Sequence, residues 1–287
     1  MTVTSRTRRT ARLATTGAFA AVAALALAAC GGGGDGGDGG DGGETGGDGG
    51  GDASGLELVA DGTLTVCSDI PYPPFEVEDS SAESGYSGFD MDVMQEIATR
   101  LDLTLSVQDV SFDALQSGAV LGAGQCDVGA SAMTITEERA QNLDFSDPYY
   151  DSLQSLLVPA DSGVTSLDNF SGSLGVQQGT TGQSYAEEHA PEGAELIEFP
   201  SDGELWPALQ GGTIQGILQD LPVNVEHAKA DSSYVIVEEY DTEESYGFAF
   251  AKGEKPNLLA AVNEQLQAMR DDGTYDEIYD GYFSAEG

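Results

Sequence analysis

The chain has 287 residues, enough for one large or two medium domains, and carries 50 acidic against 10 basic residues, a formal charge of −40. No basic surface is available to neutralise phosphates, so the composition argues strongly against nucleic-acid binding, and anionic lipid headgroups would repel the chain. The 40% of apolar residues are enough to form a core, which argues against global disorder.

The first 29 residues have the pattern of a bacterial lipoprotein signal peptide. Four arginines lie before residue 13, and an uncharged apolar run extends from Ala18 to Ala29. This run is shorter than the ~20 residues that a helix needs to span a bilayer. The small residues before Cys30 resemble a lipobox, in which the cysteine becomes the lipid-bearing first residue of the mature chain. We expect lipidation of Cys30 and attachment to the cell membrane; an ordinary signal peptide that ends near a cysteine is the alternative.

Residues 30–55 predict a disordered tether. Positions 31–55 contain 16 glycines and 6 acidic residues and almost no apolar side chain, so nothing there offsets the entropy of ordering. A random coil of this length spans roughly 25–30 Å. The order of lipid, tether and globular part is the one expected of a protein held at the outer face of a membrane.

Two further cysteines, Cys67 and Cys126, lie at the ends of expected strands. An exported chain resides in an oxidising compartment, where an even pair of cysteines favours a disulfide. Two buried free thiols are the alternative. With only two cysteines and a sizeable core, a disulfide would reinforce the fold and not define it.

From residue 56 on, short apolar runs alternate with helical stretches, which predicts an α/β fold with mostly parallel sheet. Apolar spacing predicts a helix near 93–101, with Asp90 or Asp92 as its N-cap, and a long helix over 258–269 near the C-terminus. Further helices are expected at 184–189, 204–210 and 222–230. The expected strands are 64–67, 103–107, 127–130, 156–158, 174–176, 196–199, 216–218, 235–237 and 247–250.

Eight motifs that follow one another in a fixed order relate the chain to a known family. They are DIPYPPF at 69–75, GFDMD at 88–92, MTITEER at 133–139, FSDPYY at 145–150, VQQGTTG at 176–182, QDLP at 219–222, YGFA at 246–249 and DGTYDEIY at 272–279. The chain resembles the extracytoplasmic solute-binding proteins of polar-amino-acid ABC importers, solute-binding protein family 3, over residues 60–284. The motifs are specific for the family and much less so for the ligand.

The resemblance implies a two-lobed, periplasmic-binding-protein-like fold of type II with two hinge crossovers. Lobe 1 would comprise residues 56–150 plus 250–287, and lobe 2 residues 151–249. The crossovers would lie near 149–153 and 245–249. A ligand would bind in the cleft, with the lobes closing on it, and the loaded protein would deliver it to a permease and ATPase.

The family pattern also implies which residues contact an amino acid. The ligand's carboxylate would bind Arg139, Thr134, Thr181 and Ser131, its ammonium Asp220 and the backbone of Ala132, and its side chain would face Asp69, Tyr72, Phe112, Gln177 and Asp90. A guanidinium pairs with a carboxylate through two charge-assisted hydrogen bonds, and the free N–H groups after Gly179 would favour an anion. Acidic residues without a cation nearby in the sequence disfavour an acidic ligand, so a polar or basic amino acid is expected.

Other functions stay open at this point. A compatible solute such as ectoine could replace the amino acid, the same cleft could serve a signalling receptor, and a few relatives of the fold are cyclic-acid dehydratases. The two histidines, His189 and His227, neighbour no nucleophile motif, and no His/Cys cluster has metal spacing, so neither an enzyme nor a cofactor or metal site is expected. We expect a monomer. The acidic, lysine-poor composition suits high-salt surroundings, with a merely acidic exported protein as the alternative.

Overall fold

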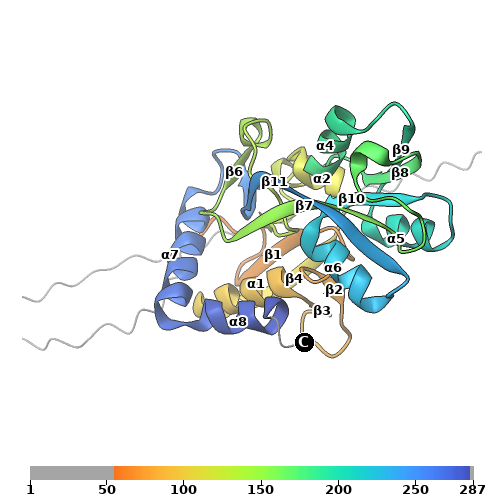
Figure 1. Cartoon of the computed structure of the whole chain (residues 1–287). Coiled ribbons are helices and arrows are strands. Elements are labelled where there is room, and N and C mark those ends of the chain that lie inside the picture. Colours follow the sequence, from red (N-terminus) through yellow and green to blue (C-terminus); the bar gives the residue numbers. More distant parts are fainter. Residues whose placement is uncertain (1–54, 285–287) are drawn as a thin grey trace, which may run out of the picture. The chain divides into compact units, whose positions relative to one another are not determined.

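The computed structural model describes residues 55–284, which form an α/β fold with two five-stranded sheets and a two-stranded ribbon (Figure 1). This confirms the predicted fold class. The predicted signal peptide, the lipidation site Cys30 and nearly all of the predicted tether lie outside the described residues. Among the helices described, none is long and apolar enough to cross a membrane.

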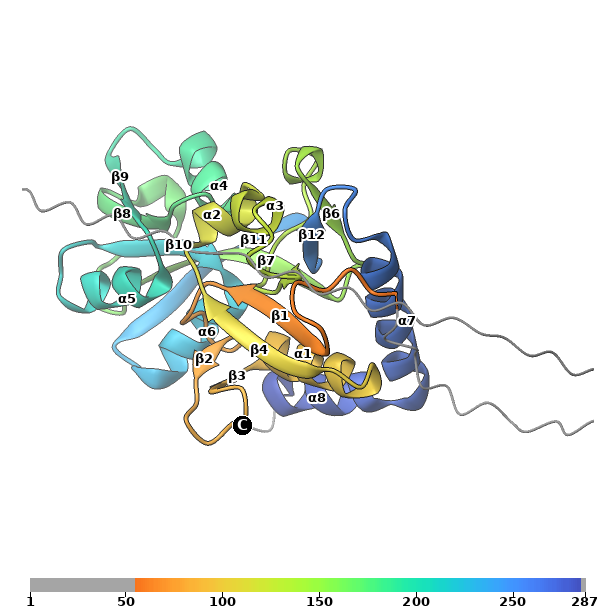
Figure 2. The same ribbon diagram turned by 180° about the vertical axis from the view of Figure 1, so that it is seen from behind.

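The first sheet is mixed. Strand β1 runs parallel to β4, its neighbour in Figure 2, and to β5, whereas β12 is antiparallel to β5 and β6. The prediction of mostly parallel sheet is therefore wrong for the β12 edge, where the chain returns from the second sheet. The order across the sheet is β4 (Thr104–Asp109), β1 (Thr63–Ser68), β5 (Val128–Gly129), β12 (Ala249–Ala251) and β6 (Leu143–Phe145).

Three helices pack together on the first sheet: α1, α7 and α8 (Figure 1). They bury the largest apolar core, which includes Phe89, Met94, Ile97, Val262 and Leu266. The long helix predicted near the C-terminus is α7, and α8 follows it after Gly273. The helices associated with this sheet are α1 (Phe89–Arg100), α2 (Phe112–Gln116), α3 (Ala119–Gly122), α7 (Pro256–Asp272) and α8 (Thr274–Phe283).

Helix α1 begins earlier than predicted, and its N-cap is Gly88, not Asp90 or Asp92, which lie within the first turn. Gly88 has φ 125°, and a Cβ added there would lie 2.2 Å from the carbonyl oxygen of Phe75. The close approach of two backbone segments thus requires glycine and fixes where the helix starts.

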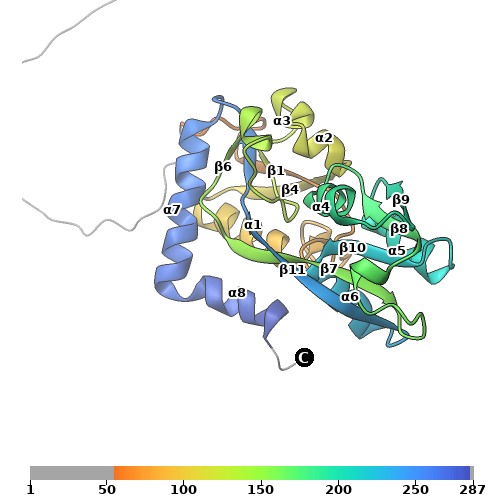
Figure 3. The ribbon, with the colours of Figure 1, turned by 45° about the horizontal axis from the view of Figure 1, so that its top comes forward.

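The second sheet is also mixed. Strand β10 is parallel to β8, which is parallel to β9, whereas β7 runs antiparallel to both β10 and β11. Helices α4 and α5 pack on β8 and β10, and α6 packs on β7 and β11 (Figure 3). The order is β11 (Tyr234–Tyr246), β7 (Tyr150–Pro159), β10 (Gly216–Asp220), β8 (Gly172–Gln177) and β9 (Ala194–Phe199), with α4 (Thr181–His189), α5 (Asp202–Gln210) and α6 (Leu221–Ala230).

Apolar runs in this sheet are continuous because both of its faces are covered. Leu156 and Val158 belong to one apolar cluster, whereas Leu157, between them, belongs to the cluster on the other face. Only these short apolar runs were recognisable as strands in the sequence. The observed β7 and β11 have 10 and 13 residues, since their polar ends continue the pairing toward the first sheet.

The minor elements are two short strands and two 3-10 turns. None was predicted, because each is too short to show a periodic pattern. They are β2 (Val77–Glu78), β3 (Tyr86–Ser87), η1 (Arg139–Gln141) and η2 (Leu167–Asn169).

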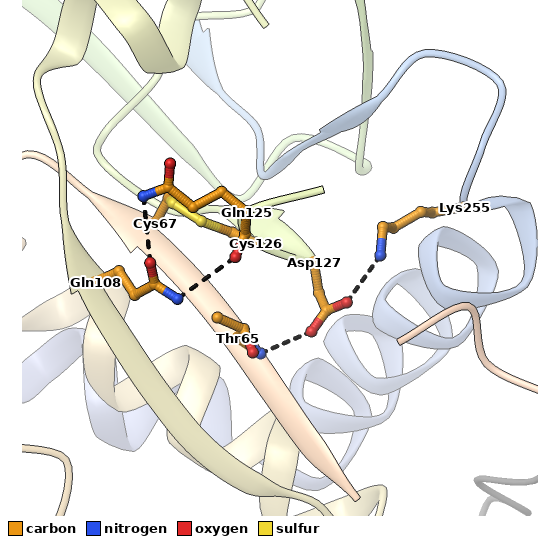
Figure 4. The surroundings of a disulfide bond; sticks show 7 residues. All are labelled: Thr65, Cys67, Gln108, Gln125, Cys126, Asp127 and Lys255. Carbon is orange, nitrogen blue, oxygen red and sulfur yellow. Dashed lines mark hydrogen bonds and ion pairs between the residues drawn. A yellow bond between two sulfur atoms is a disulfide. The ribbon is translucent and has the colours of Figure 1, made fainter. Parts of the chain in front are cut away.

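Cys67 and Cys126 are joined by a disulfide with 5.7 Å between their Cα atoms, as the sequence predicted (Figure 4). Next to it, Asp127 accepts hydrogen bonds from the backbone N–H groups of Val59 and Thr65, and Lys255 Nζ lies 2.8 Å from its Oδ1. Asp127 thus connects β1 with the start of α7 and also binds the backbone of Val59.

Candidate binding site

A small cavity lies between residues of the first sheet and residues of the second. The lining residues are Asp69, Tyr72, Phe112, Ser131, Ala132, Thr134, Arg139, Gln177, Thr180, Thr181 and Asp220. The structure therefore brings together every predicted ligand-contact residue except Asp90.

Strand ends position much of this lining. Asp69 directly follows β1, Asp220 is the last residue of β10, and Gln177 is the last residue of β8. Ser131 and Ala132 come two and three residues after β5. Parallel strands bring their carboxyl ends to the same edge of a sheet, so residues far apart in sequence meet there.

Arg139 is 6% exposed and is the cation of the cavity lining. Its Nη1 donates to the carbonyl of Thr134 at 2.7 Å and its Nη2 to the carbonyl of Gly179 at 2.9 Å. Its guanidinium carbon lies 5.2 Å from the centre of the Phe112 ring. Burial lowers the pKa of Arg139, and the charges of Asp220 and Glu244 oppose that lowering. Two backbone bonds use only part of its five N–H donors, so donors are left for a ligand.

Asp220 lies among three donors. Its Oδ2 accepts from the hydroxyls of Tyr72 at 2.9 Å and Tyr246 at 2.5 Å, and its Oδ1 accepts from Gln154 Nε2 at 2.5 Å. Burial and, after it, the charge of Glu244 raise the pKa of Asp220 to about 6, although these hydrogen bonds lower it. A ligand ammonium placed here would stabilise the ionised form.

Asp69 and Gln177 form a second polar contact, from opposite sheets. Gln177 Nε2 donates to Asp69 Oδ2 at 2.6 Å. Burial is the main cause that raises the pKa of Asp69 to about 7, with smaller contributions from the charges of Asp109 and Asp202. Together with Asp220, the cavity presents two carboxylates and one guanidinium, so its chemistry suits a zwitterion or a ligand with excess positive charge.

Thr134 and Thr181 place two hydroxyls 3.5 Å apart, from a loop after β5 and from the first residue of α4. Thr180, which the sequence analysis did not select, also lines the cavity. Its hydroxyl caps α4 by accepting from the N–H of Gln183 at 3.1 Å, and it donates to the carbonyl of Gln177 at 2.8 Å. Its position beside Thr181 before a helix was the signal that could have identified it.

Ser131 and Ala132 line the cavity, but buried carboxylates hold them from behind. The hydroxyl of Ser131 donates to Glu76 Oε1 at 2.5 Å, and the N–H of Ala132, at φ 43°, donates to Asp90 Oδ2 at 2.9 Å. The proton of Ser131 and the N–H of Ala132 are thus already used within the protein.

The structure differs from the sequence prediction for Asp90. Asp90 is fully buried, does not line the cavity, and also accepts a hydrogen bond from the Tyr149 hydroxyl at 2.7 Å. Burial raises its pKa to about 7. The carboxylate of Asp90 holds the backbone of Ala132 in place from behind the cavity wall, so its influence on a ligand is indirect.

Polar residues of the two strands that pass between the sheets complete the site. Gln154 of β7 and Glu244 and Tyr246 of β11 are buried and contact the lining residues Asp220 and Thr181. Tyr246 lies in a recognised motif, but Gln154 and Glu244 carried no signal among 50 acids and many amides. In the described part of the chain no cluster of His, Cys, Asp and Glu could hold a metal ion.

A buried polar group in the helices of the second sheet lies close to this site. His227 Nε2 is 2.9 Å from Asp202 Oδ1, and the ring of Trp206 stacks on His227 at 4.3 Å and 6°. These residues belong to α5 and α6. At the start of α5, a Cβ on Gly203 would lie 3.1 Å from Pro71, so this helix abuts the segment that carries Asp69 and Tyr72.

The sequence matches the model of bacterial extracellular solute-binding proteins, family 3, over residues 64–285. It is 30% identical over 229 residues to a probable histidine-binding protein of Neisseria gonorrhoeae, covering 77% of this chain and 83% of that protein. It is 35% identical over 198 residues to the ABC transporter glutamine-binding protein GlnH of Bacillus subtilis, covering 67% of this chain and 71% of that protein.

Solved structures agree with the sequence match. An ancestral arginine-binding protein bound to glutamine has a TM-score of 0.72 at 32% identity, covering 78% of this chain and 99% of that chain. The ancestral amino acid-binding protein AncCDT-1, a precursor of cyclohexadienyl dehydratase, has a TM-score of 0.70 at 35% identity, covering 78% and 96%. These relatives are amino-acid-binding proteins, and their likeness extends over most of the globular part.

Proposed function

Because the chain belongs to family 3 of the bacterial extracellular solute-binding proteins, we propose that it captures a polar or basic amino acid in this cavity and delivers it to the permease of an ABC importer. The observation that carries the proposal is the pairing of Arg139 and Asp220 as opposite charges on the wall of one small cavity. A free amino acid carries a negative carboxylate and a positive ammonium, and each would find an oppositely charged partner there.

In this proposal the ligand's carboxylate pairs with the free N–H groups of Arg139 and the hydroxyls of Thr134 and Thr181. Its ammonium pairs with Asp220. The aliphatic part lies between the rings of Tyr72 and Phe112, which both line the cavity. Ser131 and Ala132 contribute the backbone wall that Glu76 and Asp90 support.

The side-chain end of the cavity favours a hydrogen-bonding or cationic group. Asp69 and Gln177 meet there, and the cation Arg139 is occupied by the carboxylate in this proposal. An acidic side chain would face Asp69 without a counter-ion, which is unfavourable in a buried site. Histidine, glutamine and arginine, the amino acids named for the relatives, have side chains of the favoured kinds.

Calorimetric titration and thermal-shift screening with the twenty amino acids and with compatible solutes such as ectoine test the proposal. A ligand at 100 times its dissociation constant stabilises the folded chain by about 2.7 kcal/mol. We expect arginine, histidine or glutamine to shift the melting temperature and aspartate and glutamate not to shift it. Absence of a shift with every amino acid would refute the proposal.

We also propose that residues 1–29 are removed, that Cys30 carries the lipid, and that residues 30–55 tether lobe 1 (56–150 plus 250–287) and lobe 2 (151–249) to the outer face of the membrane. The lipobox-like residues before Cys30 and the glycine-rich composition support this arrangement. A Cys30→Ser variant of the full chain should move from the membrane fraction to the soluble extracellular fraction, whereas the unchanged chain stays with the membrane.

A further inference from the structure

Glu244 is one of the buried carboxylates in a chain with 50 acidic residues. It is 8% exposed and lies near the end of β11, where that strand reaches the first sheet. The N–H of Ile135 donates to the carbonyl of Ser245 at 2.9 Å, and the N–H of Gly247 donates to the carbonyl of Met133 at 3.0 Å. These two bonds hold the backbone of Thr134 beside the end of β11.

A local irregularity turns the Glu244 side chain inward. The pairing of β11 with β7 shifts in register between Tyr240 and Glu244, and Glu243 has φ 54°. In a regular strand, side chains alternate between the two faces, and the extra residues of a bulge change which face follows. The buried residues after this shift are Glu244 and Tyr246, both of which contact the site.

The carboxylate of Glu244 is fully supplied with donors by the protein itself. Its Oε2 accepts from Thr134 Oγ1 at 2.8 Å and from Thr181 Oγ1 at 2.9 Å. Its Oε1 accepts from Thr242 Oγ1 at 2.8 Å. The amide of Gln154 lies 3.2–3.3 Å from both oxygens and also donates to Asp220. Glu244 is thus an internal anion bound by residues from both sides of the cavity.

Thr134 and Thr181 cannot serve two anions at once with the same protons. A hydroxyl has one hydrogen to donate, and in the structure both hydroxyls are within hydrogen-bond distance of Glu244. These are the hydroxyls that the proposed function assigns to the carboxylate of the ligand. A ligand carboxylate near them would also face a second negative charge through a small, poorly solvated space.

We propose that Glu244 is a specificity-determining residue of the cavity, which competes with the ligand's carboxylate for the hydroxyl protons of Thr134 and Thr181. The carboxylate is then bound by Arg139 against this competition. The cationic groups of the ligand, which face Asp220 and Asp69, therefore contribute the larger part of the affinity. This inference rests on the proposed function and adds to it a reason for preferring basic amino acids.

The test compares arginine with agmatine, which is arginine without its carboxylate, in calorimetric titrations of the unchanged chain and of Glu244→Gln. The glutamine amide is similar in shape, removes the charge, and can donate to a threonine hydroxyl and leave its proton for the ligand. We expect the ratio of arginine affinity to agmatine affinity to rise about tenfold, because a hydrogen bond to a charged group is regained. Glutamine as ligand should gain affinity as well.

Glu243→Gln is the matched control. It makes the same charge change one residue away, on an exposed side chain. The arginine-to-agmatine ratio should not change in this variant. Should Glu244→Gln fail to fold, as judged by its melting curve, Glu244→Asp keeps the charge but withdraws it from the hydroxyls. That variant should raise the ratio in the same direction.

The two proposals fail in different ways. If the unchanged chain binds no amino acid, the proposed function is wrong. If it binds arginine but Glu244→Gln or Glu244→Asp leaves the arginine-to-agmatine ratio unchanged or lowers it, the role of Glu244 is wrong while the proposed function stands.

Discussion

At the scale of single residues, two carboxylates of the cavity, Asp69 and Asp220, titrate close to neutrality because they are buried. Burial raises the pKa of Asp69 to about 7 and that of Asp220 to about 6, from an ordinary value of 3.8. Between that ordinary value and these raised values, the folded chain holds protons that the unfolded chain has released. The free energy of unfolding of the ligand-free protein therefore falls as the pH rises from about 4 to about 7.

This linkage gives a measurable slope. The melting temperature of the ligand-free chain should decrease from pH 5 to pH 7.5, and Asp69→Asn should make the decrease shallower, because the amide does not titrate. Asp161→Asn, on an exposed residue, corrects for the change in net charge. If the melting temperatures of Asp69→Asn and Asp161→Asn fall by the same amount across this pH range, Asp69 is not protonated in the folded chain.

Asp220 is the residue whose loss should affect binding most. Removing one partner of a buried charge pair costs ~2–5 kcal/mol, out of about 8 kcal/mol for a micromolar ligand. Asp220→Asn should therefore weaken amino-acid binding at least about thirtyfold, as measured by calorimetry. Asp161→Asn should bind like the unchanged chain. Binding by Asp220→Asn within about threefold of the unchanged chain would contradict the proposed ammonium contact.

The site was largely predictable from the sequence because strand-end motifs carry it. Arg139, Asp220 and Asp69 belong to recognisable motifs, and the structure gathers them around one cavity. Glu244 and Gln154 were not predictable, since their burial depends on how β7 and β11 cross between the sheets. Asp90, which the family pattern assigns to the ligand's side chain, does not line the cavity; its buried carboxylate accepts hydrogen bonds from Ala132 and Tyr149 instead.

At the scale of elements, the start of α1 depends on a single glycine. Gly88→Ala places a methyl group 2.2 Å from a backbone oxygen, and alanine resists the φ of 125°. We expect a loss of about 2 kcal/mol or more in the free energy of unfolding, measured with denaturant.

Gly85 offers the matched comparison for that experiment. It has φ 83°, and a Cβ there would meet nothing within 4 Å. Gly85→Ala should therefore cost only the conformational strain, about 1 kcal/mol. Equal losses in the two variants would mean that the contact with Phe75 contributes nothing.

Predictability of the elements followed their apolar pattern. The centres of most strands were found, but β7 and β11 proved far longer than their apolar runs because their polar ends are held by pairing with each other. Helix α8, rich in tyrosine and acidic residues, was not predicted, since its contact with α1 and α7 and not its own periodicity stabilises it. Each sheet contains antiparallel pairs because β7 and β12, the strands that follow a passage between the sheets, run against their neighbours.

At the scale of the whole molecule, the charge of −40 destabilises the compact folded state, because folding brings the negative charges closer together. Dissolved ions screen this repulsion. The Debye length falls from ~30 Å at about 0.01 M salt to ~3 Å at about 1 M. The melting temperature should therefore rise over this range of sodium chloride concentration. Equal melting temperatures at the two extremes would argue against adaptation of the chain to high salt.

The stacked pair of Trp206 and His227 also has a practical consequence. Trp206 is the single tryptophan of the chain, and its helix abuts the segment around Pro71, which follows β1 of the first sheet. Its indole emission therefore comes from one known location, on the helix that contacts the Pro71 segment. Closure of the two lobes on a ligand, which the family resemblance implies, should therefore change the tryptophan emission, and a fluorimeter can test this without an attached dye.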